Sequence, residues 1–167
     1  SSGAFWINNM HIHILGACGT FMGGVALLAK RAGHRVSGQD QHTYPPMSTQ
    51  LRDLGIEIHE GFDAAQLDPA PDCIVVGNVM SRGNEAVEAM LDRGLPYTSG
   101  PRWLADNVLR DRHVLAVAGT HGKTTTSGIL AWTLHHAGYD PGFMVAGVMH
   151  NFEQTYNLGT GEFVVVE

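Results

Sequence analysis

The chain has 167 residues, of which 44% are hydrophobic and 16% are charged, and its formal net charge is −6. This length and apolar content allow one domain or two small ones with a buried core, and they argue against a disordered chain. The negative charge argues against nucleic acid or an anionic membrane as partner, because a phosphate polymer would be repelled at long range. Any anionic ligand must therefore be held locally, by loops.

The cysteines also bear on location. Cys18 and Cys73 lie far apart in the sequence and form no C-x-x-C pair, and free thiols suit a reducing compartment. No apolar run approaches the length of a membrane span, and the N-terminus lacks the pattern of a signal peptide. We therefore expect a cytoplasmic protein.

Short apolar runs alternate with amphipathic stretches from Met10 onward. This alternation is typical of βαβ units and predicts an α/β fold with a Rossmann-like parallel sheet. Gly33 and Gly94 follow predicted helices, where a C-terminal cap needs a positive φ. The expected strands are 11–15, 35–38, 57–59, 73–77 and 95–98, and the expected helices are 22–31, 48–54, 84–93 and 101–108.

A glycine loop follows the first predicted strand, and residues 16–24 read G-A-C-G-T-F-M-G-G. This loop resembles the dinucleotide-binding pattern G-x-G-x-x-G, but Cys18 stands at the second glycine. A diphosphate can still bind at the N-terminus of the helix that follows. Asp40 ends the second strand about twenty residues further on, where an acid that binds a ribose is expected.

The polar run 109–113 precedes a second apolar strand, and we expect a domain boundary there. A first domain would then span residues 10–110 and a second would span residues 111–167. Within the second we expect a helix at 124–136, a turn at 138–142, and strands at 143–145 and 163–166.

The second domain opens on the most informative segment of the chain. Residues 114–126 read V-L-A-V-A-G-T-H-G-K-T-T-T, a buried strand that stops at a glycine loop and continues as a helix. Gly119 and Gly122 let backbone N–H groups approach a phosphate closely. Lys123 offers an ammonium group, and Thr124 offers a hydroxyl for Mg²⁺. The segment therefore predicts a P-loop that binds ATP with Mg²⁺.

This loop is shorter than the full P-loop pattern G-x-x-x-x-G-K-[ST], which would place a glycine where the chain has Val117. The alternative is a glycine-rich turn that binds nothing. Only about fifty residues remain for a domain that usually needs a hundred or more. We therefore expect the second domain to be incomplete.

The first glycine loop admits two ligands, a nicotinamide or flavin of an oxidoreductase and another diphosphate nucleotide such as a UDP-sugar. The UDP-sugar is favoured, because a redox enzyme has little use for an ATP loop in its next domain. A ligase needs both ATP and an anionic substrate. A third interpretation is a loop that serves only close packing of helix and sheet.

The ATP loop resembles that of the Mur ligases, which typically reads G-T-x-G-K-T-T, as residues 119–125 do here. The likeness covers nearly the whole chain, from residue 11 to residue 167. It includes H-I-L-G-A-C-G-T-F-M-G-G at 13–24, Y-P-P-M-S at 44–48, G-N-V-M-S-R-G-N at 77–84 and S-G-P-R-W-L at 99–104. These segments differ from the family's alanine-adding member, whose first loop usually reads G-x-G-G-x-G-M.

The resemblance implies a three-domain enzyme of peptidoglycan recycling, with a UDP-sugar domain, a central ATPase and a C-terminal domain that these residues do not include. The γ-phosphoryl group of ATP would pass to the lactyl carboxylate of UDP-N-acetylmuramate. The amine of the murein tripeptide L-alanyl-γ-D-glutamyl-meso-diaminopimelate would then displace phosphate. Alternatives are a ligase that adds L-alanine and, from other classes, a non-catalytic nucleotide-binding module or an NAD-binding domain.

The candidate ATP-binding residues cluster at the second loop. Lys123 would bridge the β- and γ-phosphates, and Thr124 would bind Mg²⁺; both are the candidate catalytic residues. The resemblance aligns Glu167 with a family acid that also binds Mg²⁺. The ATP-binding set is Gly119, Thr120, His121, Gly122, Lys123, Thr124 and Thr125.

The candidate residues for the UDP-sugar come mainly from strand ends of the first sheet, where open α/β sheets bind ligands. Arg82 could pair with a phosphate or be a solvated surface arginine. Asn151 would face the reacting carboxylate by resemblance, or form a turn. The full set is Gly16, Cys18, Gly19, Thr20, Phe21, Asp40, Asn78, Ser81, Arg82 and Asn151.

Overall fold

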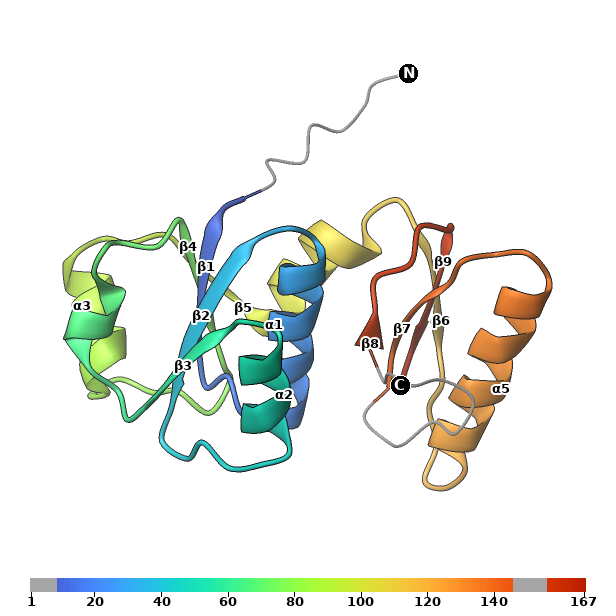
Figure 1. The fold of residues 1–167 in the computed structure, drawn as a ribbon, viewed down its shortest axis with the longest axis horizontal. Coiled ribbons are helices and arrows are strands. Elements are labelled where there is room, and N and C mark those ends of the chain that lie inside the picture. The colour runs from blue at the N-terminus through green and yellow to red at the C-terminus, as the bar shows by residue number, and fades with distance from the viewer. Residues whose placement is uncertain (1–8, 146–155) are drawn as a thin grey trace, which may run out of the picture. The chain divides into compact units, whose positions relative to one another are not determined.

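A computed structural model describes residues 9–145 and 156–167, which fold into two compact units that divide between Gly100 and Pro101 (Figure 1). The division precedes the predicted boundary by one short helical segment, and the predicted domain limits stay a prediction. Within the described ranges, every helix is too short or too polar to cross a bilayer.

The first unit is a parallel five-stranded sheet in the order β3-β2-β1-β4-β5, which confirms the predicted fold class. Helices α1 and α2 cover one face, and α3 covers the other (Figure 1). Its strands are β1 (His11–Leu15), β2 (Arg35–Asp40), β3 (Glu57–Glu60), β4 (Cys73–Val76) and β5 (Tyr97–Ser99), and its helices are α1 (Thr20–Arg31), α2 (Met47–Asp53), the 3₁₀ turn η1 (Ala64–Leu67) and α3 (Glu85–Asp92).

Two apolar layers hold the first unit together. Alternation along β1 sends Ile12 and Ile14 to one face and Leu15 to the other, and all three are buried. Leu15 belongs to the layer under α3, with Leu67, Ile74, Ala86, Val87 and Met90. On the opposite face, a Cβ at Gly38 would lie 2.7 Å from the Cβ of Ala17. Only glycine therefore lets the chain after β1 approach β2 this closely.

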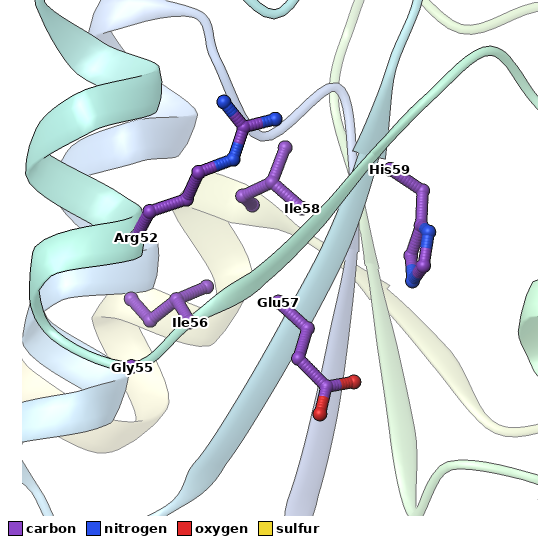
Figure 2. A pocket seen from close by; sticks show the side chains of 6 residues that line it. All are labelled: Arg52, Gly55, Ile56, Glu57, Ile58 and His59. Atoms are coloured by element: carbon purple, nitrogen blue, oxygen red, sulfur yellow. The ribbon is translucent and has the colours of Figure 1, made fainter.

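Strand β3 is an edge strand of the sheet, and its side chains alternate between the two faces. Figure 2 shows Ile56 and Ile58 on the α2 side of this strand, and Glu57 and His59 on the other side. A pocket opens here, lined by Arg52, Gly55, Ile56, Glu57, Ile58 and His59. No predicted site residue lines it, and its residues precede β3 or lie within it rather than follow a carboxyl end, so we assign it no function.

The second unit contains a four-stranded sheet in the order β6-β9-β7-β8. Strands β6, β9 and β7 are parallel, and β8 is antiparallel to β7. Helix α5 packs on this sheet through a core of Ala131, Phe143, Val145 and Val165. The elements are α4 (Gly100–Leu104), the π-helical turn η2 (Ala105–Leu109), β6 (His113–Ala116), α5 (Lys123–His136), β7 (Gly142–Met144), β8 (Tyr156–Asn157) and β9 (Phe163–Val166).

One arginine ties the entry of β9 to the rest of the second unit. The guanidinium of Arg112 donates hydrogen bonds to the carbonyl oxygens of Leu158 at 2.7 Å and Gly161 at 3.1 Å. A third bond, of 3.5 Å, reaches the carbonyl of Phe163. Since β9 runs from Phe163 toward Glu167, these bonds fix the strand that carries the predicted metal ligand.

Candidate nucleotide-binding sites

The first candidate site lies at the carboxyl ends of β1, β2 and β4, around the N-terminus of α1. Chain order reverses between the neighbours β1 and β4, since β2 and β3 lie on one side of β1 and β5 lies beyond β4. Open α/β sheets bind ligands at such a switch point. The predicted residues of the first loop follow β1, and a second predicted group follows β4: Gly16, Cys18, Gly19, Thr20 and Phe21 after β1, and Asn78, Ser81 and Arg82 after β4.

The first glycine loop is shaped by backbone bonds to β2. Gly16 has a φ of 87°, in the left-handed region that favours glycine, and its N–H donates to the Gln39 carbonyl at 2.8 Å. Gly19 is the N-cap of α1 and has no side chain to cap the helix. The first turn of α1 can therefore offer backbone N–H groups and its positive end to a diphosphate.

Asp40 connects this loop to the chain beyond β2. One carboxylate oxygen accepts the N–H of Cys18 at 2.9 Å, and the other accepts the N–H of His42 at 3.3 Å. Burial, and then the charge of Asp40, raise the pKa of the Cys18 thiol, so the thiol is neutral near pH 7. The sequence predicts that Asp40 binds a ribose. It does not predict that Asp40 anchors the glycine loop, because that hydrogen bond joins residues 22 positions apart.

The segment after β4 lies against the same loop. The Gly77 N–H donates to the Leu15 carbonyl at 2.9 Å, and a Cβ on Gly16 would lie 3.6 Å from Cε of Met80. Asn78 and Ser81 are exposed in this segment. The predicted sugar-binding residues after β1 and those after β4 are thus neighbours at the carboxyl ends of these two strands.

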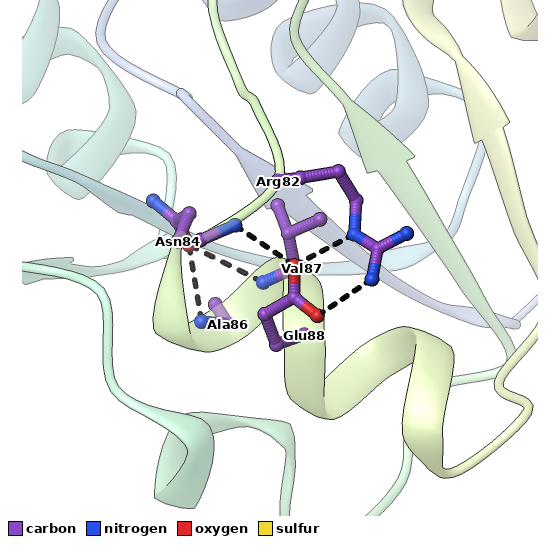
Figure 3. Close-up of polar contacts among 6 residues, drawn as sticks. Arg82, Asn84, Ala86, Val87 and Glu88 are labelled. Atoms are coloured by element: carbon purple, nitrogen blue, oxygen red, sulfur yellow. Dashed lines mark hydrogen bonds and ion pairs between the residues drawn. The ribbon is translucent and has the colours of Figure 1, made fainter.

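Arg82 is bound to Glu88 (Figure 3). The Arg82 Nε lies 2.7 Å from Oε1 of Glu88, and the Arg82 Nη2 lies 3.1 Å from Oε2. The same Oε1 also accepts the Gly83 N–H at 2.8 Å. The hydrogen bond from Arg82, and then that from Gly83, lower the pKa of Glu88 to about 2. Because the guanidinium is largely exposed, water screens this pair. To bind a phosphate through both Nε and Nη2, Arg82 would have to release Glu88.

The second candidate site lies where β6 passes through a glycine loop into α5. Gly119 and Gly122 have φ angles of 149° and 75°, which L side chains rarely adopt. Gly122 is the N-cap of α5 and no side chain caps this helix. Residues 118–122 are exposed, and Lys123 and Thr124 are half-buried at the start of the helix. The loop thus has the free backbone and helix terminus that a phosphate requires.

The two predicted metal ligands meet at this helix terminus. Because β9 pairs with β6, Glu167 at its end lies beside the start of α5. The Thr124 hydroxyl donates to the Glu167 carboxylate, with Oγ1 at 3.0 Å from Oε1 and 3.1 Å from Oε2. A hydroxyl and a carboxylate side by side are oxygen donors of the kind Mg²⁺ takes. Asn151 lies outside the described residues.

Comparisons with known proteins bear on both sites. Residues 11–112 match the family model described as "Mur ligase family, catalytic domain". The chain is 59% identical over 95% of its length to the UDP-N-acetylmuramate–L-alanyl-γ-D-glutamyl-meso-2,6-diaminoheptandioate ligase of Escherichia coli (strain K12) and spans 35% of that protein. It is 38% identical over 94% of its length to the UDP-N-acetylmuramate–L-alanine ligase of Nitrosomonas europaea, spanning 33% of that protein.

A solved structure is also similar. The crystal structure of a murein peptide ligase from Psychrobacter arcticus 273-4 matches with a TM-score of 0.88 and 52% identity, over 95% of this chain and 37% of that one. This chain has an α/β fold and two glycine loops, and the family model matches more than half of its residues. It therefore belongs to the Mur ligase family. Within the family it is more similar to the murein peptide ligase of Escherichia coli than to the alanine ligase of Nitrosomonas europaea. It spans about a third of the length of the curated relatives it matches.

Proposed function

We propose that the full-length protein carrying this chain is an ATP-dependent ligase of peptidoglycan recycling. It joins the tripeptide L-alanyl-γ-D-glutamyl-meso-diaminopimelate to the lactyl carboxylate of UDP-N-acetylmuramate and releases ADP and phosphate. The observation that carries this proposal is the pair of glycine loops, each opening onto a helix N-terminus without a side-chain cap. We keep the cytoplasm as the proposed location.

The choice of amine donor is supported by similarity alone. The relative named for the tripeptide is 59% identical to this chain, whereas the relative named for L-alanine is 38% identical. We expect the amine donor to bind in a domain outside these residues, and the geometry of the residues that the structure describes favours neither donor. A ligase that adds L-alanine therefore remains the second candidate.

The chemistry explains why ATP is needed. A carboxylate resists attack by an amine because its carbonyl carbon is electron-rich and oxide is a poor leaving group. Transfer of a phosphoryl group to the lactyl carboxylate gives an acyl phosphate, from which phosphate leaves when the amine attacks. Both steps depend mainly on positioning and on neutralising charge.

This chain's own residues would divide these tasks between the two sites. The first turn of α1 would bind the diphosphate of UDP-N-acetylmuramate, with Asp40 at the ribose and Asn78, Ser81 and Arg82 near the sugar. The amides of residues 120–124 and the Lys123 ammonium would hold the ATP phosphates. Bound Mg²⁺ would neutralise charge on the transferred group, and the adjacent oxygens of Thr124 and Glu167 fit it.

The decisive experiment measures phosphate release by the full-length enzyme with UDP-N-acetylmuramate, ATP, Mg²⁺ and either the tripeptide or L-alanine. We expect turnover with the tripeptide and its loss, by about a thousandfold or more, in Lys123→Ala. Lys30→Ala is a matched control, since Lys30 is the other lysine of this chain and lies near the C-terminus of α1. Normal turnover by Lys123→Ala would refute the P-loop assignment, and a preference for L-alanine would select the second candidate.

The oxidoreductase alternative is tested separately by calorimetry with NAD and with UDP-N-acetylmuramate. We expect binding of the sugar nucleotide, since Cys18 occupies the glycine position at which the dinucleotide pattern lets the backbone approach a pyrophosphate. A clear preference for NAD would overturn the assignment of the first site.

A further inference from the structure

Two aromatic side chains stack on the surface just beyond Asp40. The rings of His42 and Tyr44 have centroids 5.5 Å apart and planes within 8° of parallel. Tyr44 is 67% exposed, so a large part of its surface is open to solvent. The pair follows the carboxyl end of β2, and the first glycine loop follows the carboxyl end of the neighbouring strand β1.

Hydrogen bonds link this pair to the candidate diphosphate site. The Asp40 carboxylate accepts the Cys18 N–H from the glycine loop and the His42 N–H from the aromatic segment. The glycine loop, Asp40 and the stacked rings are thus linked in this order by hydrogen bonds. The order of these groups matches that of a nucleotide, in which diphosphate, ribose and base follow one another.

The backbone of Tyr44 is also held at its other end. Its carbonyl accepts the Ser48 N–H at 3.2 Å, in the first turn of α2. Beside it, Met47 packs against α1 at Gly23, where any Cβ would collide with the Met47 side chain. The segment that carries the ring is therefore anchored both to β2 and, through α2, to the helix that would bind the diphosphate.

We infer that the open face of Tyr44, backed by His42, is the platform on which the uracil base of the UDP-sugar stacks. This inference rests on the proposed function of the first site. With the diphosphate at α1 and the ribose at Asp40, the base must lie beyond the acid, where this stack stands. Aromatic rings bind bases by their π-faces and remove them from water.

The test uses the full-length protein and UDP, with dissociation constants from calorimetry. Tyr44→Leu removes the ring and is expected to weaken UDP binding roughly tenfold or more, whereas Tyr44→Phe keeps the ring and stays close to wild type. Tyr97→Leu is the matched control, because Tyr97 is 59% exposed but begins β5 at the opposite edge of the sheet.

Inorganic pyrophosphate, used as a competitor of UDP-N-acetylmuramate, separates stacking from damage to the loop. It has no base, so its inhibition constant is expected to be the same in Tyr44→Leu and wild type. Equal weakening of pyrophosphate and UDP, or unchanged UDP binding by Tyr44→Leu, would overturn the inference. Failure of the wild-type protein to bind UDP would instead refute the proposed first site itself.

Discussion

His13 is a buried histidine in the central strand of the first sheet, with 1% of its surface exposed. Its Nδ1 lies 2.7 Å from the Ser37 hydroxyl, which also lies 2.7 Å from Nε2 of His11. Among the described residues, Nε2 of His13 has no hydrogen-bond partner. Burial, and then the nearby histidines His11 and His59, lower the pKa of His13 to about 4.

This histidine makes the protein sensitive to acid. Its pKa in the unfolded chain is 6.5, so between pH 6.5 and about 4 the unfolded state binds a proton that the folded state does not. The contribution of His13 to stability is complete above pH 6.5 and is lost as the pH falls, by up to roughly 3 kcal/mol. We expect urea midpoints to drop between pH 7 and pH 5, and to drop less in His13→Gln. An equal drop in that variant would assign the acid sensitivity to other groups.

At the scale of elements, α3 depends on its N-cap. The Asn84 side-chain oxygen accepts the N–H groups of Ala86 at 3.0 Å and Val87 at 3.2 Å, as Figure 3 shows. Helix α3 buries Ala86, Val87 and Met90 against the sheet, so a weaker helix start weakens that layer. We expect Asn84→Ala to lower the free energy of unfolding by about 1 kcal/mol and Asn84→Asp to change it little. Equal losses in both variants, measured by urea unfolding, would contradict a capping role.

The elements that the sequence predicts best have strong local patterns. The limits of β1 and β9 agree with the predicted ones, because β-branched residues in a short alternating or apolar run mark a strand. The predicted C-caps Gly33 and Gly94 have positive φ angles. In contrast, β8 has two residues and exists through pairing with β7, so its own sequence carries no signal. The turn η1 is too short for a period to show, whereas η2 overlaps the helix expected at 101–108.

The candidate sites divide in the same way. Glycines at the start of a helix predict the first loop, and glycines followed by a lysine and threonines predict the second, since phosphate binding requires those residue types locally. The partners of individual side chains were not predictable. The contact between Arg82 and Glu88 depends on the path of a loop and on the rotamers of an exposed arginine and a half-buried glutamate. The three carbonyls that bind Arg112 lie 46 to 51 residues away in the sequence.

At the scale of the whole molecule, the two loops belong to different compact units. The first loop, residues 16–21, lies in the unit that ends at Gly100, and the second, residues 119–125, lies in the unit that begins at Pro101. Each loop is shaped by its own sheet: Gly16 bonds to β2, and Thr124 bonds to Glu167 beyond β9. Each nucleotide should therefore stabilise its own unit by binding the folded form.

Amide hydrogen exchange on the full-length protein can follow both loops at once. We expect UDP-N-acetylmuramate to slow exchange at residues 16–21, and ATP with Mg²⁺ to slow it at residues 119–125. Lys123→Ala should abolish the second effect and leave the first, because the Lys123 ammonium would bind phosphates only in its own unit. If ATP slowed exchange only at the first loop, or if Lys123→Ala removed the effect of the sugar nucleotide, the two nucleotides would not have separate sites and the assignment of one to each unit would be wrong.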